Sequence, residues 1–158
     1  MTRDPIEGKL KPGDAAPEFA LSDQHENTVR LSDFRGRKLL VYFYPYADTP
    51  GCTAQSCQVR DSMEDLKELD MAVVGISPDP PDKQKAFDEK YGLGFPLLAD
   101  TDHSVAEAYG VWGEPYGTGV HAVIRSSFLI DEHGRIRNAW YKVSATDTIP
   151  RAFEALVA

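Results

Sequence analysis

Residues 44–61 are Tyr-Pro-Tyr-Ala-Asp-Thr-Pro-Gly-Cys-Thr-Ala-Gln-Ser-Cys-Gln-Val-Arg-Asp, and they contain the only two cysteines of the chain, Cys52 and Cys57. The hydrophobic run at residues 39–44 predicts a buried strand. Two prolines and a glycine then mark a turn, and the polar–apolar pattern that follows predicts a helix. Cys52 is therefore expected at a strand-to-helix junction, in the first turn of the helix.

Composition narrows the class of protein. The chain has 158 residues, which predicts one domain, and a formal charge of −8 from 17 basic and 25 acidic residues. It has no Lys/Arg cluster, so nucleic acid and anionic membrane are not expected partners. No apolar run approaches the roughly 20 residues of a membrane span, and the first residues lack the apolar core of a signal peptide. These features predict a cytoplasmic protein. Thiols stay reduced there, so two close cysteines indicate catalysis, redox sensing or metal binding.

Hydrophobic periodicity and turn residues predict an alternating order of strands and helices. Residues 1–16 are expected to be loosely ordered, and the glycine-rich residues 110–121 are expected to form a loop. The expected strands are residues 18–21, 28–31, 38–44, 71–77, 95–99, 124–130 and 136–141. The expected helices are residues 56–69, which continue from the cysteine stretch, and residues 82–91, 104–109 and 146–157.

This order predicts an α/β fold. The strand–helix alternation in the middle of the chain implies parallel strand pairs joined by right-handed crossovers. The first two strands form an N-terminal β-hairpin, and the last two form a closing hairpin at an antiparallel edge. The expected architecture is a mixed central sheet with helices on both faces.

The expected position of Cys52 suits thiol chemistry. A cysteine is nucleophilic as the thiolate, which is favoured at helix N-termini and beside cations. The first backbone N–H groups of a helix have no partner within it, so they would stabilise a thiolate and an oxygen atom bound beside it. Thr49 places a hydroxyl three residues before the sulfur, where it could exchange a hydrogen bond with the reacting atom.

The spacing between the two cysteines carries a second inference. Residues five apart on an α-helix have Cα atoms about 8–9 Å apart and point about 140° away from each other. A disulfide needs Cα atoms no more than about 7 Å apart. Either Cys52 and Cys57 never bond, or the helix unwinds when they do.

Several segments resemble a known family. Residues 45–52, Pro-Tyr-Ala-Asp-Thr-Pro-Gly-Cys, resemble the peroxiredoxin signature Pro-x-x-x-Thr-x-x-Cys. A second cysteine five residues later resembles the Q-type branch, also called bacterioferritin comigratory protein. Five further segments resemble parts of Q-type sequences and occur in the same order. They are residues 12–17, 31–36, 75–79, 95–100 and 125–131. The resemblance covers nearly the whole chain and implies a thioredoxin-like fold and thiol peroxidase activity towards hydrogen peroxide and organic hydroperoxides.

The resemblance also implies a role for each matching residue. Cys52 would be the peroxidatic cysteine that becomes a sulfenic acid, and Cys57 the resolving cysteine that forms a disulfide with it. Thr49 and Arg125 would orient the peroxide and stabilise charge, and Pro45 would shield the pocket from water. No metal, haem or flavin is implied. Electrons would come from thioredoxin or a similar dithiol, and the protein would be a monomer or a weak dimer.

Other interpretations of these residues remain open. Cys57 can be an ordinary core cysteine, with an external thiol resolving Cys52. Thr49 can be a turn or capping residue, and Arg125 a surface charge. The four histidines are scattered without ligand spacing to the cysteines, so metal binding is not expected. His121 is the nearest of them to Arg125 in sequence and is a candidate for contact with the pocket.

Two alternative functions also remain. A thioredoxin-like disulfide oxidoreductase would be expected to carry Cys-x-x-Cys, whereas this pair has four intervening residues. A non-enzymatic redox sensor would share the switch between the two cysteines but would not need Arg125. Turnover with excess reductant separates a peroxidase from a sensor that stops after one oxidation.

Overall fold

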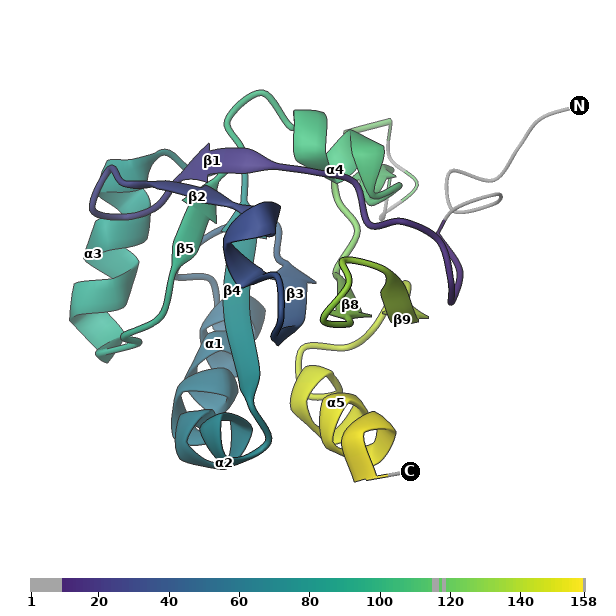
Figure 1. The fold of residues 1–158 in the computed structure, drawn as a ribbon. Coiled ribbons are helices and arrows are strands. Elements are labelled where there is room, and N and C mark those ends of the chain that lie inside the picture. Colours follow the sequence, from purple (N-terminus) through teal and green to yellow (C-terminus); the bar gives the residue numbers. More distant parts are fainter. Residues whose placement is uncertain (1–9, 115–116, 118, 158) are drawn as a thin grey trace, which may run out of the picture.

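The structure is a computed structural model that describes residues 10–114, 117 and 119–157. Within that part of the chain, a seven-stranded sheet has the order β2-β1-β5-β4-β3-β8-β9 (Figure 1). Its strands are β1 (Ala20–Ser22), β2 (Thr28–Arg30), β3 (Lys38–Phe43), β4 (Met71–Ser77), β5 (Leu97–Ala99), β8 (Ser126–Ile130) and β9 (Ile136–Trp140). A separate two-stranded sheet pairs β6 (Trp112–Gly113) with β7 (Ala122–Val123).

Helices cover both faces of the central sheet. They are α1 (Pro50–Asp61), α2 (Met63–Glu68), α3 (Pro81–Tyr91), α4 (Ser104–Ala108), α5 (Thr148–Val157) and a 3-10 turn, η1 (Leu31–Phe34). On one face, α1, α2, α3 and α5 pack on alternate residues of β3, including Leu40 and Tyr42. On the other face, η1 and α4 pack on Leu39 and Val41. Figure 1 shows α4 on the opposite side from α1, α2 and α5.

The predicted fold class is confirmed. Strand β3 pairs in parallel with β4, and β4 pairs in parallel with β5. Strand β8 runs antiparallel to both β3 and β9, which makes the sheet mixed and gives the predicted closing hairpin. The predicted N-terminal hairpin is also present, because Ala20 of β1 lies opposite Arg30 of β2.

The helix predicted over residues 56–69 is wrong as a single helix. Helix α1 ends at Asp61, and α2 begins at Met63. Between them, the Ser62 N–H is shared by the carbonyls of Gln58 and Val59, while the Ser62 carbonyl accepts a bond from Leu66 and starts the next helix. Val59 of α1 and Leu66 of α2 are fully buried in the same cluster, so both helices still pack on the same face of the sheet. The helix that carries both cysteines is therefore separate from α2.

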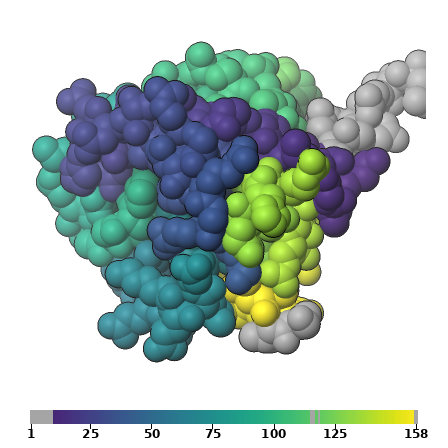
Figure 2. All heavy atoms as spheres, in the orientation of Figure 1, coloured from purple at the N-terminus to yellow at the C-terminus, as the bar shows by residue number. Residues whose placement is uncertain are grey.

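The expected loose order of residues 1–16 is wrong for residues 10–16, and residues 1–9 lie outside the described part. The Gly13 N–H donates to the Ile136 carbonyl at 2.8 Å, and the Ile136 N–H donates to the Asp14 carbonyl at 2.8 Å. The Ala16 N–H donates to the Gly134 carbonyl at 2.9 Å. Figure 2 shows this purple segment against the green C-terminal strands. The segment is ordered because the open edge of the β8–β9 hairpin offers backbone partners.

The boundaries near residue 125 also differ from the prediction. Part of the expected loop at residues 110–121 is strand, because Trp112 in β6 pairs with Val123 in β7. The expected strand at residues 124–130 begins only at Ser126. The Ile124 N–H instead donates to the Val111 carbonyl at 2.7 Å, which ties the start of this segment to the β6–β7 ribbon. Arg125 therefore lies just outside β8, at the end of the sheet.

A glycine in β4 makes room for the buried ring of Tyr42. Gly75 lies opposite Tyr42 of β3, and a Cβ atom at Gly75 would be 2.8 Å from Tyr42 Cζ. We expect Gly75→Ala to lower the free energy of unfolding by about 1–3 kcal/mol, because the buried ring must shift. Urea denaturation measures the change. Wild-type stability in the variant would contradict this close approach.

Candidate active site

Cys52 lies in the first turn of α1, as the sequence predicts. Thr49 is the N-cap residue with an extended backbone (φ −87°, ψ 156°), and Pro50 occupies the first helical position. The Thr53 N–H donates to the Thr49 carbonyl at 2.8 Å, which closes the first helical turn. The backbone N–H groups of Gly51 and Cys52 precede this bond, so the helix leaves them free to act as donors. The Cys52 side chain is fully buried.

Arg125 contacts the sulfur directly. Its Nη2 donates to Cys52 Sγ at 3.3 Å. The two residues meet because β8 runs antiparallel to β3, with Ser126 opposite Phe43. The start of β8 therefore lies beside the end of β3, where the chain turns into α1. A guanidinium in this position can donate to negative charge on an oxygen atom that binds beside the sulfur.

Gln55 holds the other arm of the guanidinium, and it is not among the site residues predicted from the sequence. Arg125 Nη1 donates to Gln55 Oε1, and Gln55 Nε2 donates to Thr148 Oγ1 at 2.7 Å. Gln55 is fully buried although it is polar. Its position three residues after Cys52 places it on the same helix face, which was the available signal.

Gly51 lets the arginine approach the helix. A Cβ atom at Gly51 would be 3.1 Å from Arg125 Nη2, tighter than an ordinary contact. The glycine between Pro50 and Cys52 is therefore explained by the guanidinium that lies over the start of α1. The role of Gly51 is therefore steric. The turn signal of Pro50-Gly51 does not predict this role.

Thr49 makes a local turn bond in this structure. Its hydroxyl donates to the Tyr46 carbonyl at 3.0 Å. Among the described residues, that hydroxyl makes no hydrogen bond to Cys52. Because its proton points to Tyr46, the oxygen lone pairs remain available as acceptors at the start of the helix.

The loop that carries Pro45 and Thr49 is anchored at both ends of α3. Pro45 is buried at the end of β3. The Ala47 N–H donates to Asp79 Oδ2 at 2.7 Å, just before α3. The Asp48 carboxylate accepts bonds from the Tyr91 hydroxyl at 2.6 Å and from Lys90 Nζ at 2.9 Å, at the end of α3. These two bonds, Tyr91 first, lower the pKa of Asp48.

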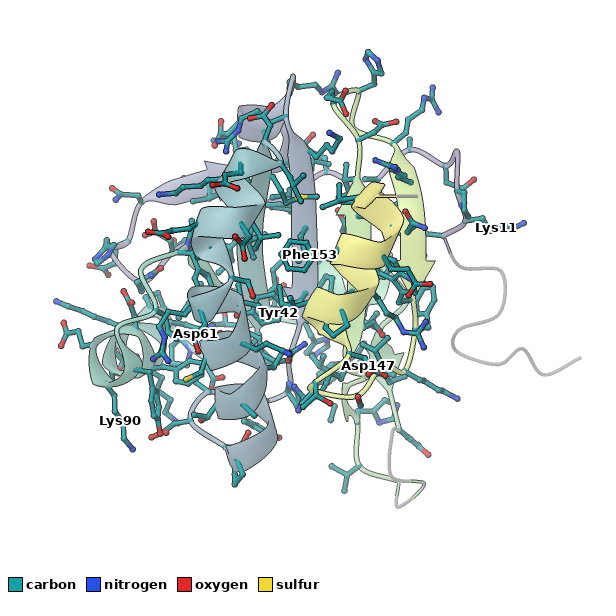
Figure 3. The ribbon with its side chains drawn as sticks, turned by 90° about the horizontal axis from the view of Figure 1, so that it is seen from below. Lys11, Tyr42, Asp61, Lys90, Asp147 and Phe153 are labelled. Carbon is teal, nitrogen blue, oxygen red and sulfur yellow. The ribbon has the colours of Figure 1, made fainter. Side chains whose placement is uncertain are left out.

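Cys57 lies on the same intact helix and does not bond to Cys52. Both cysteines are free thiols, and Cys57 is half-buried against the cluster that contains Cys52. Between them on α1, Ser56 Oγ shares a 2.8 Å hydrogen bond with the buried Tyr42 hydroxyl. Burial raises the pKa of Tyr42 far above its ordinary value, so this hydroxyl is neutral. Figure 3 shows Tyr42 between α1 and α5.

His121 packs on Trp112 of β6, and among the described residues no hydrogen bond joins it to Cys52 or Arg125. Its ring faces Trp112, with ring centroids 6.3 Å apart and an interplanar angle of 30°. His103 stacks on the same indole with centroids 4.0 Å apart.

Over the described ranges, no group of three or more His, Cys, Asp or Glu side chains is arranged to hold a metal ion. No described helix has both the length and the apolar character that a membrane crossing requires.

Known proteins resemble this chain in sequence and in structure. The sequence profile of the AhpC/TSA family matches residues 12–139. The chain belongs to the AhpC/TSA family. Peroxiredoxin Bcp of Escherichia coli is 50% identical over 133 residues, which cover 83% of this chain and 85% of that protein. A putative peroxiredoxin of Mycobacterium tuberculosis is 50% identical over 145 residues, covering 90% and 92% of the two chains.

Solved peroxiredoxin structures share the fold. Peroxidoxin BcpB of Mycobacterium tuberculosis superposes with a TM-score of 0.85 at 33% identity and covers 94% of this chain and 97% of its own. A cysteine-to-serine mutant of peroxiredoxin Q from Xylella fastidiosa gives a TM-score of 0.87 at 26% identity, covering 94% and 98%. The resemblance to Q-type peroxiredoxins and the thioredoxin-like fold are therefore confirmed.

Proposed function

We propose that this protein is a thiol peroxidase that reduces hydrogen peroxide and organic hydroperoxides through Cys52. The observation that carries the proposal is the buried Cys52 sulfur at the start of α1, with Arg125 Nη2 at 3.3 Å. The relatives named peroxiredoxin support it. So does the Xanthomonas campestris bacterioferritin comigratory protein, whose trapped complexes concern alkyl peroxide reduction, at a TM-score of 0.82 and 28% identity.

In the first step, the Cys52 thiolate attacks the distal oxygen of the peroxide. The S–O bond forms as the O–O bond breaks, and the leaving alkoxide or hydroxide takes up a proton as an alcohol or water. Arg125 and the free N–H groups of Gly51 and Cys52 stabilise the negative charge that moves from sulfur to the leaving oxygen. Thr49 accepts a hydrogen bond from the peroxide O–H, and buried Pro45 keeps water from the sulfur.

In the second step, Cys57 resolves the sulfenic acid. Its thiolate attacks Cys52 sulfur, hydroxide leaves as water, and a Cys52–Cys57 disulfide forms. Both cysteines lie on intact α1, so α1 must unwind between them. The break at Ser62 supports this step, because α1 can unwind without pulling on α2. A dithiol such as thioredoxin then reduces the disulfide.

The remaining proposals concern the setting. We propose one domain, since both hydrophobic clusters pack on the two faces of the same sheet. We propose a monomer or weak dimer in the cytoplasm, where the two free thiols would be maintained.

The disulfide oxidoreductase alternative predicts reduction of insulin disulfides. The contact of Arg125 with the sulfur favours a peroxidase over a sensor, which needs no such charge.

Replacement of the resolving cysteine separates the two steps. We expect Cys57→Ser to consume one equivalent of hydrogen peroxide at the wild-type rate and then to lose thioredoxin-supported turnover, because Cys52 cannot form the intramolecular disulfide. Stopped-flow fluorescence measures the first step, and NADPH oxidation coupled to thioredoxin reductase measures recycling. Unchanged steady-state turnover would show that an external thiol resolves Cys52.

A further inference from the structure

A buried chain of polar side chains leads from Cys52 to the first residue of α5. Cys52 contacts Arg125, Arg125 contacts Gln55, and Gln55 Nε2 donates to Thr148 Oγ1 at 2.7 Å. Thr148 Oγ1 also shares a 3.3 Å hydrogen bond with Ser127 Oγ on β8. Thr148 is only 1% exposed. The chain therefore joins the N-terminus of α5 and strand β8 to the reacting sulfur.

The chemistry of the Gln55 amide gives Thr148 a specific task. A guanidinium has only donors, so Gln55 must present its oxygen to Arg125. The amide nitrogen then points away, into a buried site, and needs an acceptor there. Thr148 Oγ1 is that acceptor. Without it, the nitrogen would be buried without a partner, and a rotated amide would set two donors against the guanidinium.

We propose that Thr148 is a positioning residue for peroxide reduction: its hydroxyl fixes the orientation of the Gln55 amide, and so holds Arg125 against Cys52. This inference rests on the proposed function of Cys52. It assigns a task to the C-terminal helix, which otherwise contributes apolar packing through Ile149 and Ala152. The packing of α5 on α1 is thereby coupled to the reactivity of the sulfur.

The test compares Thr148→Val with Thr148→Ser. Valine keeps the shape and removes the hydroxyl, whereas serine keeps the hydroxyl and removes the methyl group. We expect Thr148→Val to lower the second-order rate constant of reduced protein with hydrogen peroxide by about 10–100-fold, because misplaced catalytic groups cost factors of this size. We expect Thr148→Ser to stay within about threefold of wild type, since it retains the acceptor. Equal slowing in both variants would overturn the proposal.

A stability control separates positioning from packing. Ile149→Val changes the next residue of the same helix, which is 4% exposed and packs in the same cluster. We expect it to lower the melting temperature without changing the rate constant. The pH profile of Cys52 alkylation, measured with Cys57→Ser as the background, should move to higher pH in Thr148→Val and stay in place in Ile149→Val. If the rate constant and the melting temperature fell together in both Thr148→Val and Ile149→Val, Thr148 would be only a packing residue.

A double substitution tests the orientation argument directly. Glutamate at position 55 has two equivalent carboxylate oxygens, and either one can accept from Arg125. Its side chain therefore needs no second acceptor to fix its orientation. In the Gln55→Glu background, we therefore expect Thr148→Val to change the rate constant by less than about threefold. If Thr148→Val lowered the rate constant as much in this background as in the protein with Gln55, the proposal would be contradicted. If wild type itself fails to reduce peroxide, the proposed function fails instead, which the same assay shows before any variant is compared.

Discussion

Replacement of Cys52 by serine is expected to lower the rate of peroxide consumption by at least about a thousandfold, because the hydroxyl is a far weaker nucleophile and the remaining groups only stabilise charge. The sulfur lies in the first turn of α1 and accepts a hydrogen bond from Arg125 Nη2. Loss of hydrogen peroxide in the presence of excess dithiothreitol measures the rate. The serine is nearly isosteric, so the fold should be retained.

The matched control is Cys57→Ser, which removes the other thiol of the same helix. It should keep the single-turnover rate, so general damage to α1 is separated from loss of the nucleophile. Mass spectrometry after one equivalent of peroxide should find one added oxygen on Cys57→Ser and none on Cys52→Ser. Full activity of Cys52→Ser would end the proposed mechanism.

The second large effect is expected at Arg125. We expect Arg125→Lys to lower the second-order rate constant with hydrogen peroxide by about 100–1,000-fold, the range found when a donor to a developing charge is lost. The guanidinium binds Cys52 with one arm and Gln55 with the other. An ammonium has no second arm at that spacing, so one of the two partners loses its bond.

The control for Arg125 is Arg151→Lys, which makes the same chemical change at an exposed position on α5. It should leave the rate constant unchanged. Stopped-flow mixing of the reduced proteins with peroxide gives both values, and circular dichroism checks the fold. A rate for Arg125→Lys within about threefold of wild type would show that a positive charge suffices and that the planar, two-armed contact does not matter.

The sequence alone predicted the local frame of the reaction. The hydrophobic run into Tyr44, the turn residues Pro50 and Gly51, and the periodic pattern after them placed Cys52 at the start of a helix, where the structure has it. The five-residue spacing to Cys57 depends only on helix geometry, so the conflict between helix and disulfide also follows from sequence. Such features are decided by neighbours in the chain, and their signals are local.

The contacts of two residues were not predicted from the sequence. Gln55 looks like an ordinary polar helix residue, and its role depends on Arg125 and Thr148, which come from distant segments. Gly75 looks like an interruption of a strand, and its role depends on the register that sets it opposite Tyr42. In each case the contacting residue belongs to a different segment of the chain, so local periodicity carries no information about the contact.

What the sequence determined by itself is the strand–turn–helix unit that carries Cys52, together with the order of the seven strands of the central sheet. What only the tertiary structure decided is how the distant segments meet that unit. The β3–β8 register brings Arg125 to the sulfur, and residues 13–16 are held by backbone bonds to the β8–β9 hairpin. The physical reason is that register and backbone pairing use groups that every residue carries, so their outcome depends on the packing of the whole sheet.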